Sequence, residues 1–266
     1  MPAPSESADK ERGARRRNLL HGRRKGPKLS AHRAALFESL LPRLELVLRP
    51  DSDPETWFDS SVGDLWLEIG FGAGEHLLWQ ARHHPGVGII GAEPYEAGIA
   101  KLLSKLLSPF SSAEEGDAET GSSGYDRERG NHLNIRLYRG DARDVMEALP
   151  DCSLGRVFIL FPDPWPKKRH HKRRFIQTGI LDEFARVLKP GAELRFASDD
   201  PGYVEWALEH FRAHHAFEWL ARRAQDWRTR PSDWPPTRYE EKALHGAPIF
   251  LGFRRQHLQI PVSRRT

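Results

Sequence analysis

The chain has 266 residues, of which 38% are hydrophobic and 29% charged, and its 41 Lys and Arg against 37 Asp and Glu give a net charge of +4. This length suits one α/β domain with extensions, and no apolar run approaches the roughly 18 residues that cross a bilayer, so we expect no membrane role. The only cysteine, Cys152, excludes a disulfide framework and a cysteine-built metal site, and the start of the chain lacks the apolar core of a signal peptide, so we expect a cytoplasmic protein.

From residue 64 onward, short β-branched and aromatic runs alternate with helical stretches, which is typical of a mostly parallel, doubly wound α/β sheet. We therefore expect residues 34–266 to form a single domain. In chain order the pattern predicts an amphipathic helix over 34–48, then strands over 65–69, 87–92, 133–138, 157–161, 194–197 and 249–253, and helices over 74–82, 97–107, 143–149, 175–188 and 203–214. Lys189-Pro190-Gly191 is expected to close the helix over 175–188.

Two segments fall outside this rhythm. Residues 1–33 are basic and contain the breakers Gly22, Gly26 and Pro27, which predicts a mostly disordered N-terminal arm. Residues 108–131 are rich in Ser, Gly and acids and almost empty of apolar residues, which predicts a disordered insertion between the second sheet helix and the third strand. We assign no chemistry to this insertion.

Positive charge is concentrated in two runs. Nine Lys or Arg and no acid lie between Arg12 and Arg33, and residues 167–174 hold six Lys or Arg and two His. A single basic run is as often a solvated tail as a binding surface. Two such runs in one chain favour a polyanionic partner such as nucleic acid.

A glycine-rich turn, LEIGFGAG over 67–74, joins the first sheet strand to its helix. Gly70, Gly72 and Gly74 let the backbone turn sharply and let a ligand approach without a Cβ in the way. Glu68 is a charge in an otherwise apolar strand, so we expect its carboxylate to meet a cation. The second strand ends in Glu93, where an acid can accept both hydroxyls of a ribose.

A dinucleotide-dependent dehydrogenase would use a similar layout, but its fingerprint places a third glycine where this chain has Glu75. A carboxylate there would sit badly beside a pyrophosphate, so we favour a cofactor without phosphates, S-adenosylmethionine, whose ammonium group would meet Glu68. Asp141, after the third strand, is placed for the adenine amine. Its alternative role is an N-cap for the helix over 143–149.

The segment Phe161-Pro162-Asp163-Pro164-Trp165-Pro166 follows the fourth strand. An open α/β sheet binds ligands beyond the carboxyl ends of its strands, so this loop should line the pocket. Its prolines hold Asp163 in place, and Trp165 offers a flat face on which a base can stack. Alone, the loop could be a rigid surface turn, but the second basic run begins at the next residue. An acid and an aromatic ring beside a phosphate-binding run suit chemistry on an RNA base.

The segment FPDPWPKKRHHKRR (161–174) closely resembles the signature of the tRNA (guanine-N7-)-methyltransferases, the TrmB-like family. LEIGFGAG, the acid that ends the second strand and TRYEEKA (237–243) follow in the order that this family shows, and GRRKGPKLS (22–30) is similar to its basic lead-in. The resemblance covers roughly residues 18–107 and 132–255, and the insertion over 108–131 departs from the family core.

The resemblance implies an RNA-binding enzyme of tRNA modification with a Rossmann-like fold. Such an enzyme transfers the methyl group of S-adenosyl-L-methionine to N7 of a guanine in the variable loop of tRNA, forming 7-methylguanosine. The partner is then tRNA, with no obligate protein partner and the oligomeric state left open. The resemblance also places the cofactor and reaction centre at Glu68, Glu93, Asp141 and Asp163, substrate contacts at Lys167, Asp199, Thr237, Arg238, Tyr239 and Glu240, and RNA contacts at Arg169, His170, His171, Lys172, Arg173 and Arg174.

Asp163 is the predicted catalytic residue. Guanine N7 carries an in-plane lone pair and needs no deprotonation before it attacks, so the carboxylate would balance the charge that forms on the ring. Asp200-Pro201 reads as an N-cap followed by proline at the first helical position, which leaves Asp199 without a structural role. Thr237 and Glu240 have the spacing of a capping box, and that role is compatible with substrate binding.

Two other functions stay open at this point. A methyltransferase acting on an exocyclic base nitrogen uses a similar Asp-Pro-Pro-aromatic loop, although here Trp165 follows Pro164. A non-enzymatic RNA-binding protein with a relic cofactor fold is disfavoured by the intact glycine turn and its two acids. No metal site is expected, because adjacent histidine pairs lack the i, i+4 spacing of a zinc helix; these pairs are His83-His84, His170-His171 and His214-His215.

Overall fold

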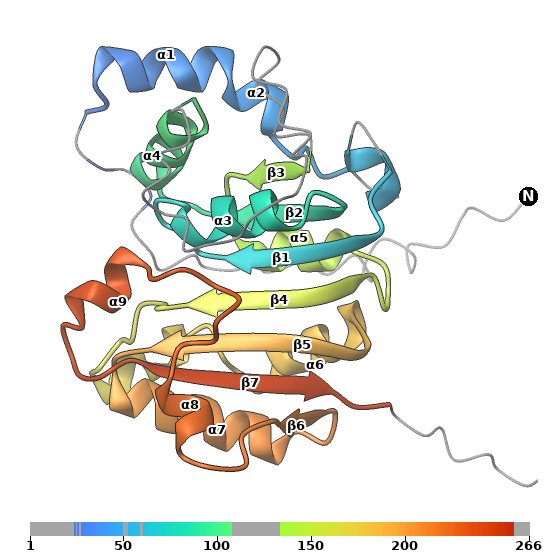
Figure 1. The fold of residues 1–266 in the computed structure, drawn as a ribbon, viewed down its shortest axis with the longest axis vertical. Coiled ribbons are helices and arrows are strands. Elements are labelled where there is room, and N and C mark those ends of the chain that lie inside the picture. Colours follow the sequence, from blue (N-terminus) through green and yellow to red (C-terminus); the bar gives the residue numbers. More distant parts are fainter. Residues whose placement is uncertain are drawn as a thin grey trace, which may run out of the picture.

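The computed structural model describes residues 24, 26, 28–49, 53–58, 61–107 and 134–257. Most of the predicted N-terminal arm and the whole predicted insertion over 108–131 lie outside these residues. The described residues form one sheet with helices on both faces (Figure 1).

The sheet has seven strands in the order β3-β2-β1-β4-β5-β7-β6. The first five strands along the chain pair in parallel, whereas β7 is antiparallel to both β5 and β6. The expected doubly wound, mostly parallel sheet is thereby confirmed. The strands are β1 (Asp64–Ile69), β2 (Val87–Ala92), β3 (Ile135–Tyr138), β4 (Leu154–Leu160), β5 (Leu188–Ser198), β6 (Phe217–Trp219) and β7 (Ile249–Arg255).

Two hydrophobic clusters form because neighbouring residues of a strand point to opposite faces of the sheet. In β1, Leu67 and Ile69 enter one cluster with α5 (Ala142–Ala148), α6 (Thr178–Val187) and α7 (Pro201–Ala213). Trp66 enters the other cluster with α3 (Glu75–His83), α4 (Glu96–Leu106) and α1 (Ala31–Ser39). The sheet is therefore covered on both faces, as its continuous apolar strands require.

The helix expected over 34–48 is wrong in its bounds. Ser30 caps α1 with its side chain, so the helix begins at Ala31, inside the segment predicted to be a disordered arm. It ends at Ser39, and a separate short helix, α2 (Leu41–Leu44), carries Pro42 in its first turn. Proline suits that position because it lacks a backbone N–H. Glu45 then pairs with Leu137 beside β3, so the chain is extended where helix was expected.

The region after β4 also differs from expectation. The helix expected over 175–188 begins only at Thr178, and β5 starts directly at Leu188. The expected breaker Lys189-Pro190-Gly191 is thus part of a strand much longer than the predicted 194–197. Several elements of three to six residues were not predicted, because segments this short show no clear hydrophobic periodicity. They are β6, the 3₁₀ helices η1 (Pro54–Trp57) and η3 (Lys168–Arg173), α8 (Gln225–Arg228) and α9 (Arg238–Lys242).

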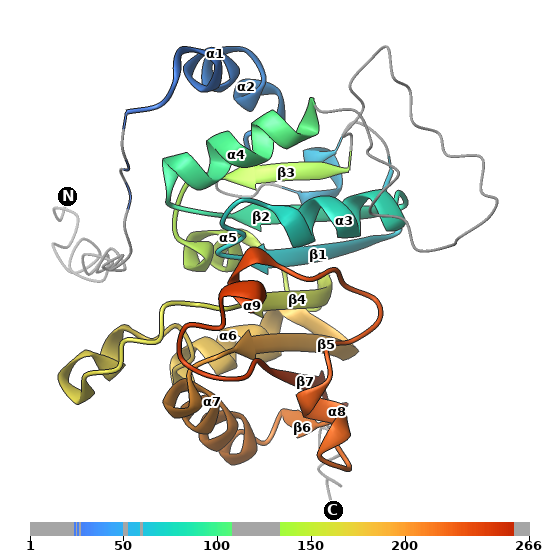
Figure 2. The same cartoon turned by 60° about the vertical axis from the view of Figure 1, so that its left-hand side comes forward.

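The chain changes direction across the sheet between β1 and β4. From β1 it adds β2 and β3 on one side, and from β4 it adds β5 on the other. Loops after β1 and β4 therefore leave the same edge and diverge, which opens a crevice at that point. The α9 segment lies at this edge, beside the carboxyl ends of β1 and β4 (Figures 1 and 2).

Candidate active site

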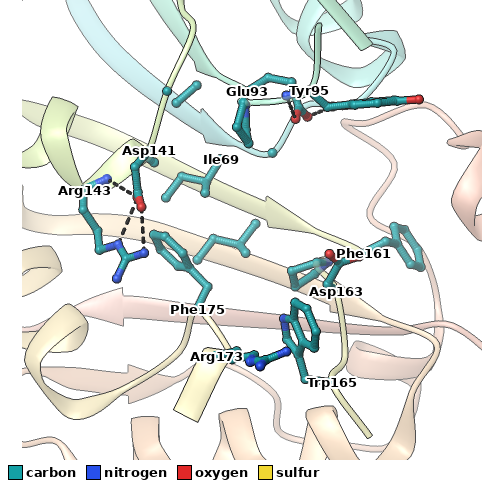
Figure 3. Close-up of a pocket in the computed structure, with 18 of the residues that line it drawn as sticks. Ile69, Glu93, Tyr95, Asp141, Arg143, Phe161, Asp163, Trp165, Arg173 and Phe175 are labelled. Carbon is teal, nitrogen blue, oxygen red and sulfur yellow. Dashed lines mark hydrogen bonds and ion pairs between the residues drawn. The ribbon is translucent and has the colours of Figure 1, made fainter. Parts of the chain in front are cut away.

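A cavity of about 290 Å³ lies in this crevice. Its wall is built by the turn after β1, the end of β2, the turn after β3 and the loop after β4, together with single residues from η3 and α9. Figure 3 shows Glu93 and Asp141 on one side of the cavity and Asp163 and Trp165 on the other. The predicted site residues that line it are Gly70, Gly72, Glu93, Asp141, Asp163, Arg173 and Tyr239.

The glycine turn has the backbone that the sequence predicted. Gly70, Gly72 and Gly74 all have positive φ, at 70°, 58° and 72°, a region that glycine enters without steric cost. A Cβ on Gly70 would meet nothing within 4 Å, so space lies open beside this residue. A Cβ on Gly74 would lie 2.6 Å from a methyl carbon of Leu102. The first glycine therefore leaves room at the pocket wall, and the third lets α3 and α4 pack closely.

Glu93 is buried at the end of β2 and is held by two backbone groups. The N–H of Gly72 donates to Oε2 at 2.7 Å, and the N–H of Tyr95 donates to Oε1 at 2.9 Å. Burial raises the pKa of Glu93 to about 7, against the opposing effect of these hydrogen bonds. The negative charge of Asp163 contributes to this raised pKa, and both acids line the cavity.

Asp141 has the N-cap role that the sequence suggested and also lies at the cavity. It caps α5 by accepting from the N–H of Arg143 at 3.0 Å, and its side chain also lines the cavity. The Arg143 guanidinium donates to both carboxylate oxygens, at 2.9 and 2.6 Å (Figure 3). An adenine amine contacting Asp141 would therefore share a carboxylate that already has a cationic partner.

Glu68 is not among the residues that line the cavity, although we expected its carboxylate to meet the ammonium group of the cofactor. It is 3% exposed and points to the Trp66 face of the sheet, opposite to Ile69. There its Oε2 lies 2.7 Å from Nδ1 of His76, and Gln80 Nε2 lies 3.0 Å from Nε2 of the same ring. Gln80 Nε2 also donates to the carbonyl of Asp233 at 2.9 Å. The amide thus donates to Nε2 of His76, whose Nδ1–H then donates to Glu68, so the buried acid needs no ligand ammonium.

The loop after β4 is strained as well as rich in proline. Phe161 and Trp165, which each precede a proline, have φ of 52° and 45°. Side chains other than glycine rarely adopt this region, and each such residue costs about 1–3 kcal/mol unless its surroundings compensate. The N–H of Phe161 donates to the carbonyl of Ala197 at 2.7 Å, which anchors the start of the loop to β5.

Arg174 anchors the middle of the loop, and its predicted RNA contact is wrong. The residue is 4% exposed. Its Nε donates to the carbonyl of Pro164 at 2.9 Å and its Nη1 to that of Gly202 at 3.0 Å. The guanidinium also lies over the rings of Tyr203 and Trp206, at 5.0 and 5.3 Å from their centroids. A group enclosed in this way cannot reach an RNA phosphate; it ties the loop to α7.

The side chain of Arg173, the preceding residue, points to the cavity, whereas that of Arg174 points into the protein. Its guanidinium lies 4.9 Å from the Trp165 ring centroid and lines the cavity (Figure 3). In the part of the chain that the structure describes, its Nε is buried and has no hydrogen-bond partner. Arg173 therefore remains available to a ligand in a way that Arg174 is not.

The other residues of the second basic run lie outside the cavity wall. Lys167, Arg169 and Lys172 are exposed on or beside η3, so the run is a 3₁₀ turn projecting from the strand edge. The His170 ring meets Trp165 edge-on at 5.9 Å, and the His171 ring meets Trp206 at 5.4 Å. The two histidines thus pack the turn against its neighbours and leave the lysines and Arg169 facing solvent.

The α9 segment is held by contacts that the sequence predicted only in part. Thr237 caps α9 by accepting from the N–H of Glu240 at 3.3 Å, as the capping box implied, whereas Glu240 itself faces Arg230 at 3.6 Å. Asp199, expected to have no structural role, accepts from the N–H of His245 at 3.1 Å. It therefore ties the end of β5 to the chain that follows α9.

Tyr239 brings α9 to the glycine turn. A Cβ on Gly72 would lie 3.0 Å from the Tyr239 ring, so the ring covers that glycine. The Arg238 guanidinium lies 4.8 Å from the centroid of the same ring, and its Nη2 donates to the hydroxyl at 2.8 Å. The substrate segment predicted at 237–240 thus touches the cofactor turn through Tyr239, while Arg238 lies beside it.

Sequence reasoning missed several residues of the cavity wall. The structure adds apolar and aromatic side chains between the acids, namely Ile69, Tyr95, Ile159 and Phe175, and the guanidinium of Arg143. For Tyr95, its short separation from Glu93 in the sequence was a signal that it lies near the cavity. Phe175 and Arg143 carry no motif, because their place in the wall depends on how η3 and α5 pack.

The described residues contain no group of three or more His, Cys, Asp or Glu that could hold a metal ion. Among the same residues, no helix combines the length and apolar character needed to cross a bilayer.

Comparisons with known proteins converge on one family. The chain matches a family model described as "Putative methyltransferase" over residues 63–249. A protein of Rhodospirillum rubrum named tRNA (guanine-N(7)-)-methyltransferase is 49% identical over 244 residues, covering 89% of this chain and 88% of that protein. Proteins of the same name are 45% identical in Paramagnetospirillum magneticum (94% of this chain, 98% of that one) and 44% identical in Rhizobium meliloti (92% and 98%).

Proposed function

We propose how this cavity works from the premise that the chain belongs to the family of tRNA (guanine-N7-)-methyltransferases. The chain is a methyltransferase of that family. Its reaction transfers a methyl group to N7 of a guanine in tRNA and leaves 7-methylguanosine. The methyl donor that we propose is S-adenosylmethionine.

One observation carries the proposal. Two differently built loops face each other across a single cavity at the switch point of the sheet, with Glu93 on one side and Asp163 on the other. A methyl transfer between two bound molecules needs such a two-sided site, because donor and acceptor must meet in line. The glycine turn and Glu93 suit the donor, and Asp163, Trp165 and Arg173 suit a nucleobase and its phosphate.

The residues present fit S-adenosylmethionine. Glu93 is fixed by two N–H groups, and lone pairs of its carboxylate remain to accept ribose hydroxyls. The open space beside Gly70 admits the methionine part, and apolar wall residues such as Ile69 and Ala92 can cover the adenine ring. Glu75 opens α3 and pairs with Lys105 at 2.6 Å, so a carboxylate stands where a dinucleotide would bring its pyrophosphate. When bound, the cofactor supplies an electrophilic methyl group on its sulfonium.

Asp163 acts on the acceptor by charge. A bound cofactor would offer its methyl carbon to the in-plane lone pair of guanine N7, and the electron pair of the carbon–sulfur bond would leave with sulfur. No proton has to leave, but the purine ring becomes cationic. A carboxylate fixed at the loop after β4 favours that charge as it develops, which lowers the barrier without a general base.

The neighbours of Asp163 position the base. Trp165 and Arg173 form a platform of an indole ring and a guanidinium at the cavity wall, on which a purine can stack. The exposed Lys167, Arg169 and Lys172 on or beside η3 extend away from the cavity and suit phosphates. Because Arg174 holds the loop by its backbone, the platform keeps its shape before RNA arrives.

The decisive experiment is incubation of the protein with an unmodified tRNA transcript and methyl-labelled S-adenosylmethionine, followed by nucleoside analysis by mass spectrometry. We expect label in 7-methylguanosine and, from the Asp163→Asn variant, very little. Label on an exocyclic base nitrogen would contradict the N7 assignment. Binding of tRNA without any transfer would mean that the cofactor half of the cavity is inactive.

A further inference from the structure

A second group of cations lies on the side of the cavity opposite to η3. It consists of Arg33 on α1, Lys101 on α4, and Arg238 and Lys242 on α9, and we name it the α1–α4–α9 cluster. These residues are far apart in the sequence. Arg33 ends the first basic run, and the other three lie outside both basic runs. In Figure 2 the helices α1 and α4 lie on one side of the strand ends, and the chain that leaves β4 lies on the other.

A chain of contacts brings the cluster together. A Cβ on Gly98 of α4 would lie 2.4 Å from the carbonyl oxygen of Gly72, and one on Gly72 would lie 3.0 Å from Tyr239 of α9. Helix α4 therefore touches the glycine turn, and the turn touches α9. Lys101 follows Gly98 by three positions and shares its helix face. Helix α1 packs on α4 and brings Arg33 to the same side.

The electrostatics agree with this placement. Partial burial lowers the pKa of the Lys101 ammonium, and the charges of Arg238, Arg33 and Lys242 lower it further, against the opposing effect of Glu75. In the part of the chain that the structure describes, Arg33, Lys101 and Lys242 have no ion-pair partner. Lys105, one turn further along α4, does pair with Glu75 and is therefore not part of the cluster. Unpaired cations that repel one another are a cost to the free protein, which a bound polyanion removes.

The described part of the N-terminal arm runs along the same side. The N–H of Glu96, at the start of α4, donates to the carbonyl of Arg24 at 3.1 Å. A Cβ on Gly26 would lie 2.7 Å from the hydroxyl of Tyr95, which itself lines the cavity. Arg24 of the arm thus lies at the start of α4, and Gly26 lies beside Tyr95 at the cavity, on the side that carries the cluster.

We propose that the α1–α4–α9 cluster binds a second segment of the tRNA backbone, so that the RNA spans the cavity between this cluster and η3. The inference rests on the proposed function in taking tRNA as the substrate. Two phosphate contacts on opposite sides of the cavity fix the orientation of the target base, which one basic surface alone cannot do. The cluster contributes positioning of the RNA and takes no part in the transfer itself.

The test compares three proteins with the wild type: the Lys101→Ala/Lys242→Ala double variant, Arg33→Ala, and the control Arg212→Ala. Arg212 is exposed on α7, at the other end of the sheet. Affinity for full-length tRNA is measured by filter binding over a series of salt concentrations, and affinity for S-adenosylmethionine by calorimetry. The double variant is also combined with Arg173→Ala.

For the double variant we expect a loss of about tenfold or more in tRNA affinity. The slope of log affinity against log salt concentration should become shallower by about 0.7–0.9 for each phosphate contact that is lost. Cofactor affinity should stay unchanged, Arg33→Ala should show a smaller loss, and the effect should add to that of Arg173→Ala because the two surfaces are separate. A tRNA affinity and salt slope like those of Arg212→Ala would overturn the proposal. A loss of cofactor affinity as large as that of tRNA affinity would also overturn it, because the cluster would then serve the carboxylate of the cofactor. Failure of the proposed function is distinguishable, because it would show in the wild type as tRNA without label in 7-methylguanosine, whereas failure of the cluster proposal shows only in the comparison of the variants.

Discussion

The two loops that face each other across the cavity obtain their unusual backbone in opposite ways. The turn after β1 places glycines at every position with positive φ, so its shape costs little and depends on local sequence. The loop after β4 places Phe161 and Trp165 in the same region of φ, where side chains are strained. That loop keeps its shape through contacts with β5 and α7, above all the two carbonyls that Arg174 binds.

The difference follows from what each loop must present. The glycine turn presents backbone and open space, which suits a small cofactor that has to lie close to the chain. The loop after β4 presents an acid and an indole ring, so it needs side chains where glycine would be easier. Strain at the second loop is thus the consequence of carrying the side chains of Phe161 and Trp165, which flank Asp163, at a tight turn, and Arg174 compensates for it.

The largest effect is expected from removing that compensation. Arg174→Ala leaves the carbonyls of Pro164 and Gly202 without their donor and should lower the free energy of unfolding by about 2–4 kcal/mol. The methylation rate should fall as well, because the loop that holds Asp163 is released. Chemical denaturation and single-turnover kinetics measure both. Arg173→Ala is the matched control, and it should keep the stability while weakening tRNA binding. Equal stability of the two variants would contradict the contrast.

Asp163→Asn tests the chemical role of the strained loop without changing its shape. The amide cannot balance the cationic purine ring, so we expect the single-turnover rate to fall about 100-fold. Affinities for tRNA and cofactor should stay close to those of the wild type, since the loop and its anchors are intact. A wild-type rate for this variant would show that the reaction centre lies elsewhere.

Glu93 gives the cofactor side of the cavity a pH dependence. Burial raises the pKa of Glu93 to about 7, so the carboxyl is neutral below pH 7 and a poorer acceptor for ribose hydroxyls. We expect S-adenosylmethionine to bind about tenfold more weakly at pH 6 than at pH 8. Glu93→Gln should bind weakly at both values, and an unchanged pH dependence in that variant would assign the effect to another group.

The raised pKa of Glu93 changes the stability of the ligand-free protein with pH in the direction opposite to its effect on cofactor affinity. A carboxyl whose pKa is raised on folding stabilises the protein in its protonated form, so this contribution is present at low pH and is lost as pH rises through 7. The ligand-free protein should therefore gain stability from Glu93 between pH 7 and the ordinary range near pH 4.5, while its cofactor affinity declines. Thermal melts of wild type and Glu93→Gln over this range separate the contribution.

The smallest effect is expected on the glycine side. Gly70→Ala meets no neighbour within 4 Å, so only the positive φ opposes it, at a cost of about 1 kcal/mol. Gly74→Ala should cost more, because its Cβ would press on Leu102. Thermal melts would show the order, and cofactor titration of Gly70→Ala would show whether the added methyl group occupies ligand space. A larger loss for Gly70→Ala than for Gly74→Ala would contradict this account of the turn.

The sequence by itself determined the parallel, doubly wound sheet, the glycine turn and the caps at Asp141, Asp200 and Thr237. Each of these depends on residues close together in the chain: apolar periodicity sets the strand, and a polar side chain two or three positions from a free N–H sets the cap. The proline-rich segment likewise marked its own place at the end of β4. Family resemblance added the substrate, which the residues alone had limited to a polyanion and an RNA base.

Only the tertiary structure decided which partner each buried polar group meets. Glu68 was expected to meet a cation, the ammonium group of the cofactor, but its partner is the imidazole ring of His76 of α3. Arg173 and Arg174 are adjacent residues of the same type. Arg173 reaches the cavity, whereas Arg174 donates to two backbone carbonyls from distant segments. The α1–α4–α9 cluster exists only because α4 and α9 pack against one glycine turn and α1 packs on α4. Local sequence specifies backbone conformation, whereas the direction and partner of a side chain depend on elements that folding alone brings together.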